Sequence, residues 1–181
     1  PMVLDPPVDP EVDHIRGPVD AQLTLVEYID FECEYCAHAT GSWEDLRGQF
    51  GDDLRYVVRH LPHHPHGPLA AKASEAAANQ GEFWTWLDFV FTHQDALERE
   101  HLIGYAEELG LDVDRFVQDM DSEAVAERVN RDLVSAQDSG AHATPTFFVE
   151  GHRLLGDYDA RTLTAALESS RRGTRTQVAS V

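Results

Sequence analysis

The pattern of apolar and polar positions predicts strands near both ends of the chain and helices between them. Residues 22–29 and 54–61 are apolar at neighbouring positions, which is typical of strands covered on both faces. A single helix is predicted over 33–50, because apolar side chains recur on one face and Gly51 follows as a suitable end. The order strand, helix, strand predicts a parallel pair joined by a right-handed crossover.

Helical periodicity continues through most of residues 68–140. We expect helices there over residues 69–79, 82–94, 101–109, 113–120 and from Asp121 or Ser122 to Gly140. Residues 146–149 and 152–155 then flank a Glu-Gly turn, which indicates a short hairpin, and a last helix is expected over 160–169.

These elements predict one α/β domain with an all-helical insertion. We assign residues 20–62 and 142–170 to the α/β domain and residues 63–141 to the insertion. Residues 1–19 are rich in Pro and Asp and are expected to be a linker or tail, and residues 171–181 a disordered tail. The first residues also lack the basic and apolar regions of a secretory signal.

Charge and composition argue against two kinds of partner. The net charge of the 181 residues is −19 and Lys72 is the only lysine, so binding to nucleic acid, which needs clustered Lys and Arg, is not expected. No run of eighteen apolar residues occurs, so no membrane span is predicted.

The two cysteines of the chain, Cys33 and Cys36, lie two residues apart where the first strand passes into the first helix. Only a thiolate attacks a disulfide, and the unpaired N–H groups at a helix N-terminus stabilise a thiolate and lower its pKa. Cys33 is therefore predicted to be the nucleophile and Cys36 the resolving thiol. The alternatives are joint binding of a ligand, or two unrelated core cysteines.

A cluster of histidines is the main rival signal. Zinc could be held by the two cysteines together with His60, His63, His64 and His66. Prolines interrupt that segment and leave no regular ligand spacing, so no metal site is predicted and surface histidines are the preferred interpretation.

Three motifs resemble DsbA-like disulfide oxidoreductases of the thioredoxin fold. They are LVEYIDFECEYC at 25–36, RHLP at 59–62 and TPTFFV at 144–149. The resemblance covers about residues 20–170 and implies a thioredoxin-like fold, with a central mixed sheet and a helical insertion. The stretches DPEVDHIRGP and FGDDLRYVVRHLP are similar, more narrowly, to thioredoxin-like domains fused C-terminally to NhaA-type sodium/proton antiporters.

The resemblance implies a role for five residues. Cys33 matches the nucleophile and Cys36 the resolving cysteine. Glu27 matches a buried acid that relays a proton to or from Cys36. Pro145 matches a cis-proline facing the disulfide, and Thr144 matches the residue whose backbone pairs with substrate. Base rates for X–Pro bonds alone predict trans.

The residues between the cysteines differ from the Pro-His of strongly oxidising members. Glu34, with Glu32 before Cys33, is expected to oppose the thiolate by its charge. We therefore predict a pKa of Cys33 above that of strong oxidants and a less oxidising couple. Tyr35 is expected either to contact substrate or to cover the disulfide.

The function predicted from these residues is thiol-disulfide exchange with protein thiols, with the Cys33–Cys36 disulfide as the redox group and no further cofactor. The expected partners are protein thiols or disulfides, a redox partner and a fused membrane antiporter. One alternative is a non-catalytic redox-responsive or interaction domain associated with a transporter. Another is a glutathione-using transferase or isomerase, which Cys36 disfavours. A cytoplasmic location is expected, with the cell envelope as the alternative.

Overall fold

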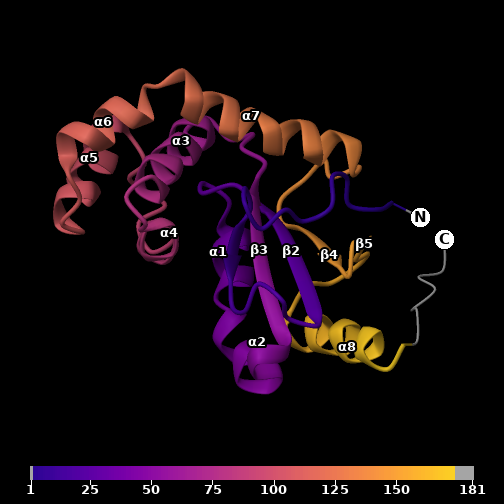
Figure 1. Cartoon of the computed structure of the whole chain (residues 1–181). Coiled ribbons are helices and arrows are strands. Elements are labelled where there is room, and N and C mark those ends of the chain that lie inside the picture. The colour runs from indigo at the N-terminus through magenta and orange to yellow at the C-terminus, as the bar shows by residue number, and fades with distance from the viewer. Residues whose placement is uncertain (1, 174–181) are drawn as a thin grey trace.

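Two parallel strands form the centre of the structure, a computed structural model that describes residues 2–173 (Figure 1). Leu23–Ile29 (β2) and Leu54–His60 (β3) pair in register from Leu23 opposite Leu54 to Ile29 opposite His60. Three shorter strands pair antiparallel beside them: His14–Arg16 (β1) on β3, Thr146–Val149 (β4) on β2, and His152–Arg153 (β5) on β4. The order β1-β3-β2-β4-β5 makes the sheet mixed, as predicted.

Successive side chains of the central strands point to opposite faces of the sheet, and both faces are buried, as the apolar pattern predicts. One face carries Leu25, Tyr56 and Phe147 and belongs to the larger apolar core, which also contains both cysteines. The other face carries Val26 and Phe148 and packs against a smaller cluster. Glu27 has the same parity as Leu25, so its carboxylate is on the face that contains the cysteines.

The helix predicted over residues 33–50 is in fact two helices. Glu34–Thr40 (α1) ends at Gly41, and Trp43–Phe50 (α2) begins after Ser42. Gly and Ser are poor helix formers in a helix interior, which explains the break. A 3-10 turn, Gly51–Asp53, leads into β3.

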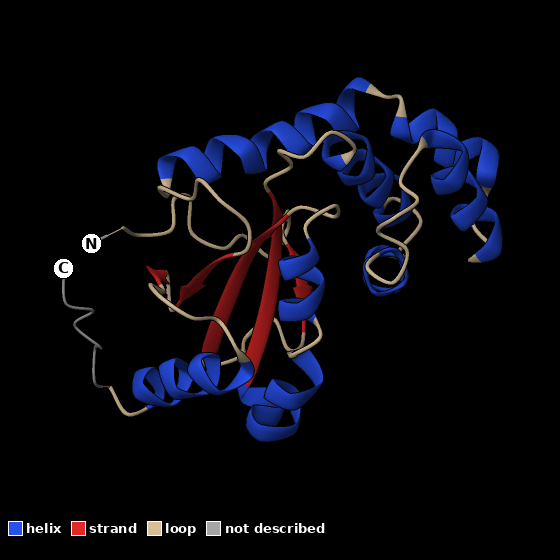
Figure 2. Ribbon diagram, turned by 180° about the vertical axis from the view of Figure 1, so that it is seen from behind, coloured by secondary structure: helices blue, strands red, loops and turns tan. Residues whose placement is uncertain are grey.

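Five helices connect β3 to β4 and lie beside the sheet, where the insertion is predicted (Figures 1 and 2). They are Gly67–Ala78 (α3), Phe83–Val90 (α4), Arg99–Glu108 (α5), Val113–Met120 (α6) and Glu123–Asp138 (α7). The long α7 returns across the sheet, while Ala160–Arg171 (α8) contacts β2 and β4. Among residues 2–173, no helix has the length and apolar character needed to cross a membrane.

The prediction that residues 1–19 are a linker or tail is wrong for the described part of this segment. β1 pairs with β3, and Leu4 is buried on the second face of the sheet. The segment is held by a buried ion pair, in which Arg59 donates to both carboxylate oxygens of Asp13 at 2.9 Å. Composition misled here because one buried charge pair and a few apolar positions order a Pro-rich segment.

The C-terminal end of the chain differs slightly from prediction. α8 extends to Arg171, two residues past the predicted end at residue 169. The rest of the predicted tail, from residue 174 on, lies outside the described residues.

Candidate active site

Cys33 and Cys36 lie where β2 leads into α1, at the edge of the larger core. Cys33 is the N-cap residue of α1, with extended backbone angles, and Cys36 lies one turn further along. Both are free thiols in this structure; Cys33 is 5% exposed and Cys36 is fully buried. Both cysteines are therefore buried, and Cys33 is the less deeply buried of the two.

The surroundings of the two sulfurs separate their pKa values. The Cys36 thiol donates a hydrogen bond to the Cys33 sulfur, and the backbone N–H groups of Cys36 and Tyr35 also donate to it. Together these hydrogen bonds lower the pKa of Cys33 to about 5, although burial acts in the opposite direction. Burial, the hydrogen bond to Cys33 and the charge of Glu27 raise the pKa of Cys36 far above the usual range of a thiol. At neutral pH the pair therefore holds one thiolate and one thiol.

Glu27 is fully buried in the middle of β2, on the face that contains the cysteines. Burial raises its pKa to about 8, although the Tyr56 hydroxyl donates a hydrogen bond to Oε2 and lowers it in part. Oε1 is buried and receives no hydrogen bond from any described residue. The carboxyl can therefore hold or release a proton close to physiological pH.

Replacing Glu27 by glutamine is expected to stabilise the reduced protein at alkaline pH. A carboxyl with a folded-state pKa near 8 and an ordinary unfolded pKa costs stability as the pH rises between those two values. Glutamine has the same shape and no such titration. The difference in Tm between Glu27→Gln and the unmodified chain should be small at pH 5, grow up to about pH 8 and then level off.

A difference in Tm that stays constant with pH would contradict the assignment of a raised pKa to Glu27. Glu34→Gln, at an exposed position on the neighbouring helix, is the matched control for the loss of one carboxylate.

The loop that carries Thr144 and Pro145 lies against Cys33. The Thr144–Pro145 peptide bond is cis, in agreement with the family resemblance. The sulfur of Cys33 is 3.5 Å from the carbonyl oxygen of Thr144. Tyr35 is 58% exposed, so its ring is available at the surface beside Cys33. The structure thus brings the residues Thr144, Pro145 and Tyr35 to the same place as the two cysteines.

The acidic residues before Cys33 are held by the histidine-containing loop that follows β3. The buried carboxylate of Asp30 accepts hydrogen bonds from the backbone N–H groups of His63 and His64, at 2.8 and 2.9 Å. Glu32 accepts from the backbone and side chain of His66, at 2.7 and 2.9 Å. The Glu32 charge is therefore paired, which weakens the opposition to the Cys33 thiolate that we expected from it.

The four histidines considered for a zinc site with the cysteines do not come together. His60 bonds to Glu75, His63 and His64 lie at Asp30, and His66 lies at Glu32.

The turn into α3 fits closely around Asp30, so Gly67→Ala is expected to destabilise the protein by about 1–3 kcal/mol. A Cβ at Gly67 would lie 2.6 Å from Oδ1 of Asp30 and 2.9 Å from Oδ2. Denaturant unfolding would measure the change. Gly104→Ala is the matched control, because Gly104 is inside α5 with open space around it, and alanine there should stabilise by roughly 0.5–1 kcal/mol. Equal effects of both substitutions would contradict the close fit.

Two residues of the site were not found from the sequence. Asp30 carried the signal of an acid at a strand end, but two of its hydrogen-bond partners, His63 and His64, lie more than thirty residues further on. Gln94 comes from the loop after α4, and its side-chain amide donates to the carbonyl oxygens of Phe31 and Cys33, both at 2.8 Å. Nothing in the local sequence marks a lone glutamine as a partner of the cysteine loop.

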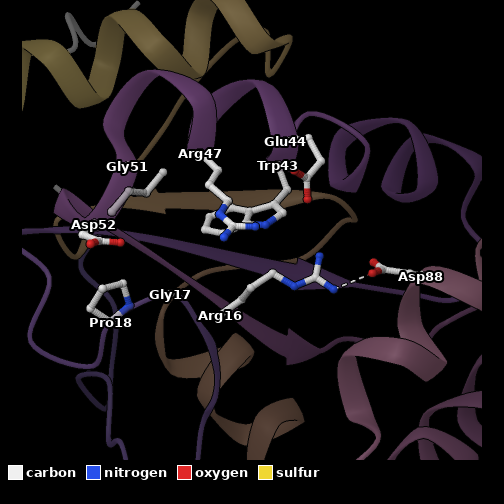
Figure 3. A pocket seen from close by; sticks show the side chains of 10 residues that line it. Arg16, Gly17, Pro18, Trp43, Glu44, Arg47, Gly51, Asp52 and Asp88 are labelled. Atoms are coloured by element: carbon white, nitrogen blue, oxygen red, sulfur yellow. Dashed lines mark hydrogen bonds and ion pairs between the residues drawn. The ribbon is translucent and has the colours of Figure 1, made fainter.

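A separate hollow of about 350 Å³ lies at the other end of the central strands and contains neither cysteine (Figure 3). It is lined by Gly51 of the 3-10 turn, by Leu54 at the start of β3, by Trp43 and by Arg16, which forms an ion pair with Asp88 across it. Its polar lining and its distance from α1 along the strands separate it from the site described above.

The chain is similar to proteins of known sequence over nearly its whole length. A family model described as thioredoxin matches residues 9–169. Na(+)/H(+) antiporter NhaA of Herminiimonas arsenicoxydans is 82% identical over 177 residues, and Na(+)/H(+) antiporter NhaA 1 of Mycolicibacterium gilvum is 49% identical over 170 residues. These alignments include 98% and 91% of this chain. The chain spans only 28% of the length of these relatives.

Solved structures agree with the fold implied by the motifs. A thioredoxin-like oxidoreductase from Silicibacter pomeroyi superposes with a TM-score of 0.82 at 26% identity, over 91% of this chain and 94% of that one. BdbD from Bacillus subtilis superposes with a TM-score of 0.81 at 22% identity, over 90% of this chain and 95% of that one. For alpha-DsbA1 from Wolbachia pipientis the TM-score is 0.77 at 18% identity, over 93% of this chain and 94% of that one. The fold is therefore thioredoxin-like, with DsbA-like neighbours, as predicted.

Proposed function

The chain belongs to the thioredoxin family, and from that membership we propose that it exchanges disulfides with protein thiols through Cys33 and Cys36. The observation that carries the proposal is the asymmetry of the pair. The sulfur near the surface has a pKa lowered to about 5, and the buried sulfur behind it has a raised pKa. A pair of this kind has one nucleophile and one protected thiol that can resolve a mixed disulfide.

The reaction follows from this asymmetry. When the pair is oxidised, a substrate thiolate attacks the Cys33 sulfur, the Cys33–Cys36 bond breaks, and Cys36 leaves with the electron pair. Its raised pKa means that it takes up a proton, for which Glu27, with a pKa of about 8, is the buried donor. A second substrate thiolate then attacks the mixed disulfide on the substrate side. Cys33 leaves as a stable thiolate, the substrate gains a disulfide, and the pair has received two electrons.

We propose that substrate is held by the surface around Cys33. The carbonyl of Thr144 lies beside the sulfur, and Tyr35 offers an exposed ring. A backbone carbonyl next to the nucleophile supports pairing with an extended substrate segment. The same chemistry runs in the reducing direction when the partner proteins supply electrons, so the direction depends on the redox partner.

Alkylation of reduced protein by iodoacetamide tests the asymmetry. The rate at Cys33 should rise with pH to half of its maximum near pH 5, because only the thiolate reacts. Cys36 should stay unmodified up to pH 9, since it is buried and its pKa is raised. Mass spectrometry of peptides would assign the modified cysteine.

Two variants separate the causes of the low pKa. Cys36→Ala removes the S–H donor to Cys33, so the midpoint of the pH profile of Cys33 alkylation should move to higher pH. Cys36→Ser keeps a hydrogen-bond donor and should move this midpoint less. A midpoint near the ordinary value of a free cysteine in the unmodified chain would contradict the proposal.

The relatives favour a second function for the same fold. Because they are named sodium/proton antiporters and this chain spans 28% of their length, we propose that the domain belongs to such a transporter. In the alternative, the redox state of the Cys33–Cys36 pair regulates the transporter, and disulfide exchange with protein substrates is incidental. A pair that cycles between oxidised and reduced forms without turning over protein disulfides would support that alternative.

A further inference from the structure

Two histidines and a glutamate form a buried cluster where β1, β3 and α3 meet. Nε2 of His14 and Nε2 of His60 each donate to the same oxygen, Oε1 of Glu75, at 2.7 Å. The potential ligand atoms of the three side chains all lie within 4.8 Å of one another. The side chains of His60 and Glu75 are 1% and 6% exposed, and His14 closes the cluster at 15%.

We propose that His14, His60 and Glu75 bind a divalent transition-metal ion, of which Zn²⁺ suits the ligand set best. Two imidazole nitrogens and one carboxylate oxygen are ligands that zinc commonly takes from proteins, and three protein ligands leave a fourth position for water or the second oxygen of Glu75. Harder ions such as Mg²⁺ and Ca²⁺ prefer oxygen ligands only.

The hydrogen bonds of the cluster are those that a metal would replace. Among the described residues, Oε1 of Glu75 accepts hydrogen bonds only from the two imidazoles that would become ligands. An ion entering the cluster would therefore replace these two N–H donors, and each neutral ring would carry its proton on Nδ1 instead of Nε2. Ser74 lies 3.4 Å from Nε2 of His60, but its hydroxyl donates to the carbonyl oxygen of Ala71 at 2.7 Å.

The histidine cluster beside the cysteines fails the same test. Oδ2 of Asp30 accepts two backbone N–H groups, from His63 and His64, in addition to the His64 side chain. Those backbone donors cannot leave without unfolding the loop, and His63 is 45% exposed.

The rings of the buried cluster are held in place without an ion. His14 stacks on Phe83 with ring centroids 3.6 Å apart, and the ring of His60 lies edge-on to the same Phe83 with centroids 6.2 Å apart. Ligand side chains held by packing bind a metal with less loss of entropy.

The charges around the cluster also favour a cation. Arg128 lies 3.9 Å from Glu75, but it forms a closer ion pair with Asp132 at 2.7 Å. Asp13, next to His14, is paired with Arg59. The neighbouring charges are therefore matched, and the negative charge of Glu75 is left for the metal.

The proposal is tested by measuring zinc binding to a Cys33→Ser, Cys36→Ser double variant, which has no thiolate that could bind the ion. Calorimetry at pH 7.5 should show one Zn²⁺ per chain, and zinc should raise the Tm. In the same background His14→Gln and Glu75→Gln should each weaken binding by at least about tenfold and remove the rise in Tm. His63→Gln should bind as tightly as the parent.

Two results would overturn the proposal. One is the absence of stoichiometric binding by the parent protein. The other is binding that survives His14→Gln and Glu75→Gln but is lost in His63→Gln, which would place the ion at Asp30. If both variants fail to fold, Co²⁺ binding to the parent protein and to its His63→Gln variant decides. A visible spectrum typical of tetrahedral nitrogen and oxygen ligands in both proteins supports the cluster, and its absence from the parent or its loss in His63→Gln contradicts it.

Discussion

Replacing Cys33 by serine is expected to abolish thiol-disulfide exchange. A serine hydroxyl has no anion at neutral pH and cannot form a disulfide, so neither the mixed disulfide nor the internal one can form. Turnover of insulin disulfides in the presence of dithiothreitol should fall to the uncatalysed rate. Fold and Tm should change little, because the oxygen replaces a sulfur of similar shape at the surface of the core.

Cys36→Ser is the matched variant, and it should behave differently. The nucleophile remains and the resolving thiol is lost, so protein substrates should accumulate as mixed disulfides on Cys33. Non-reducing gels followed by mass spectrometry would detect them. Equal turnover by the Cys33→Ser variant and the unmodified chain would contradict a role for Cys33. Mixed disulfides that form on Cys36 of the Cys33→Ser variant would show that Cys36 is the nucleophile and Cys33 the resolving thiol.

Asp13→Ala is expected to destabilise the protein by about 3–5 kcal/mol, the largest change we expect from a residue outside the site. Arg59 is 1% exposed and keeps its charge when Asp13 is removed. The guanidinium retains the carbonyl oxygens of Pro6 and Pro7 as acceptors, but these do not neutralise it. β1 and the segment before it should then lose their attachment to β3. Denaturant unfolding and proteolysis after residue 13 would measure both effects.

The exposed pair formed by Arg99 and Asp121 is a control of the same bidentate type. Asp121→Ala should change stability little, since water screens both partners. The Arg59 hydrogen bonds, acting against burial, keep the pKa of Asp13 below its usual value. Its contribution should therefore be complete above about pH 4 and be lost as the pH falls through the folded-state pKa. An Asp13→Ala variant as stable as the unmodified chain would show that the pair does not hold the N-terminal segment.

The central strands and the two cysteines were predictable because their signals are local. Continuous apolar runs specify strands covered on both faces, and a Cys-x-x-Cys sequence at a strand-to-helix junction places one sulfur at a helix N-terminus. The hypothesis that Glu27 relays a proton rested on the family resemblance, because a single carboxylate inside a strand does not reveal what faces it. Its hydrogen bond from Tyr56 joins two strands that are separated in the chain by α1 and α2.

The features that were missed depend on contacts between distant parts of the chain. The N-terminal segment has the composition of a linker, and the ion pair that holds it joins Asp13 to Arg59, forty-six residues away in the sequence. His14 and Glu75 are separated by sixty-one residues, so no ligand spacing pointed to their cluster. The break between α1 and α2 is the exception, because Gly41 and Ser42 carried a local signal that the apolar stripe outweighed.

The equilibrium between reduced and oxidised protein in glutathione buffers tests the central claim most directly. We expect a reversible two-electron couple of Cys33 and Cys36, with a potential between about −270 and −120 mV. The reason is that a Cys33 pKa of about 5 lies between those of thioredoxin and of a strongly oxidising DsbA protein. Both cysteines remaining reduced at every ratio of glutathione to its disulfide would contradict the account.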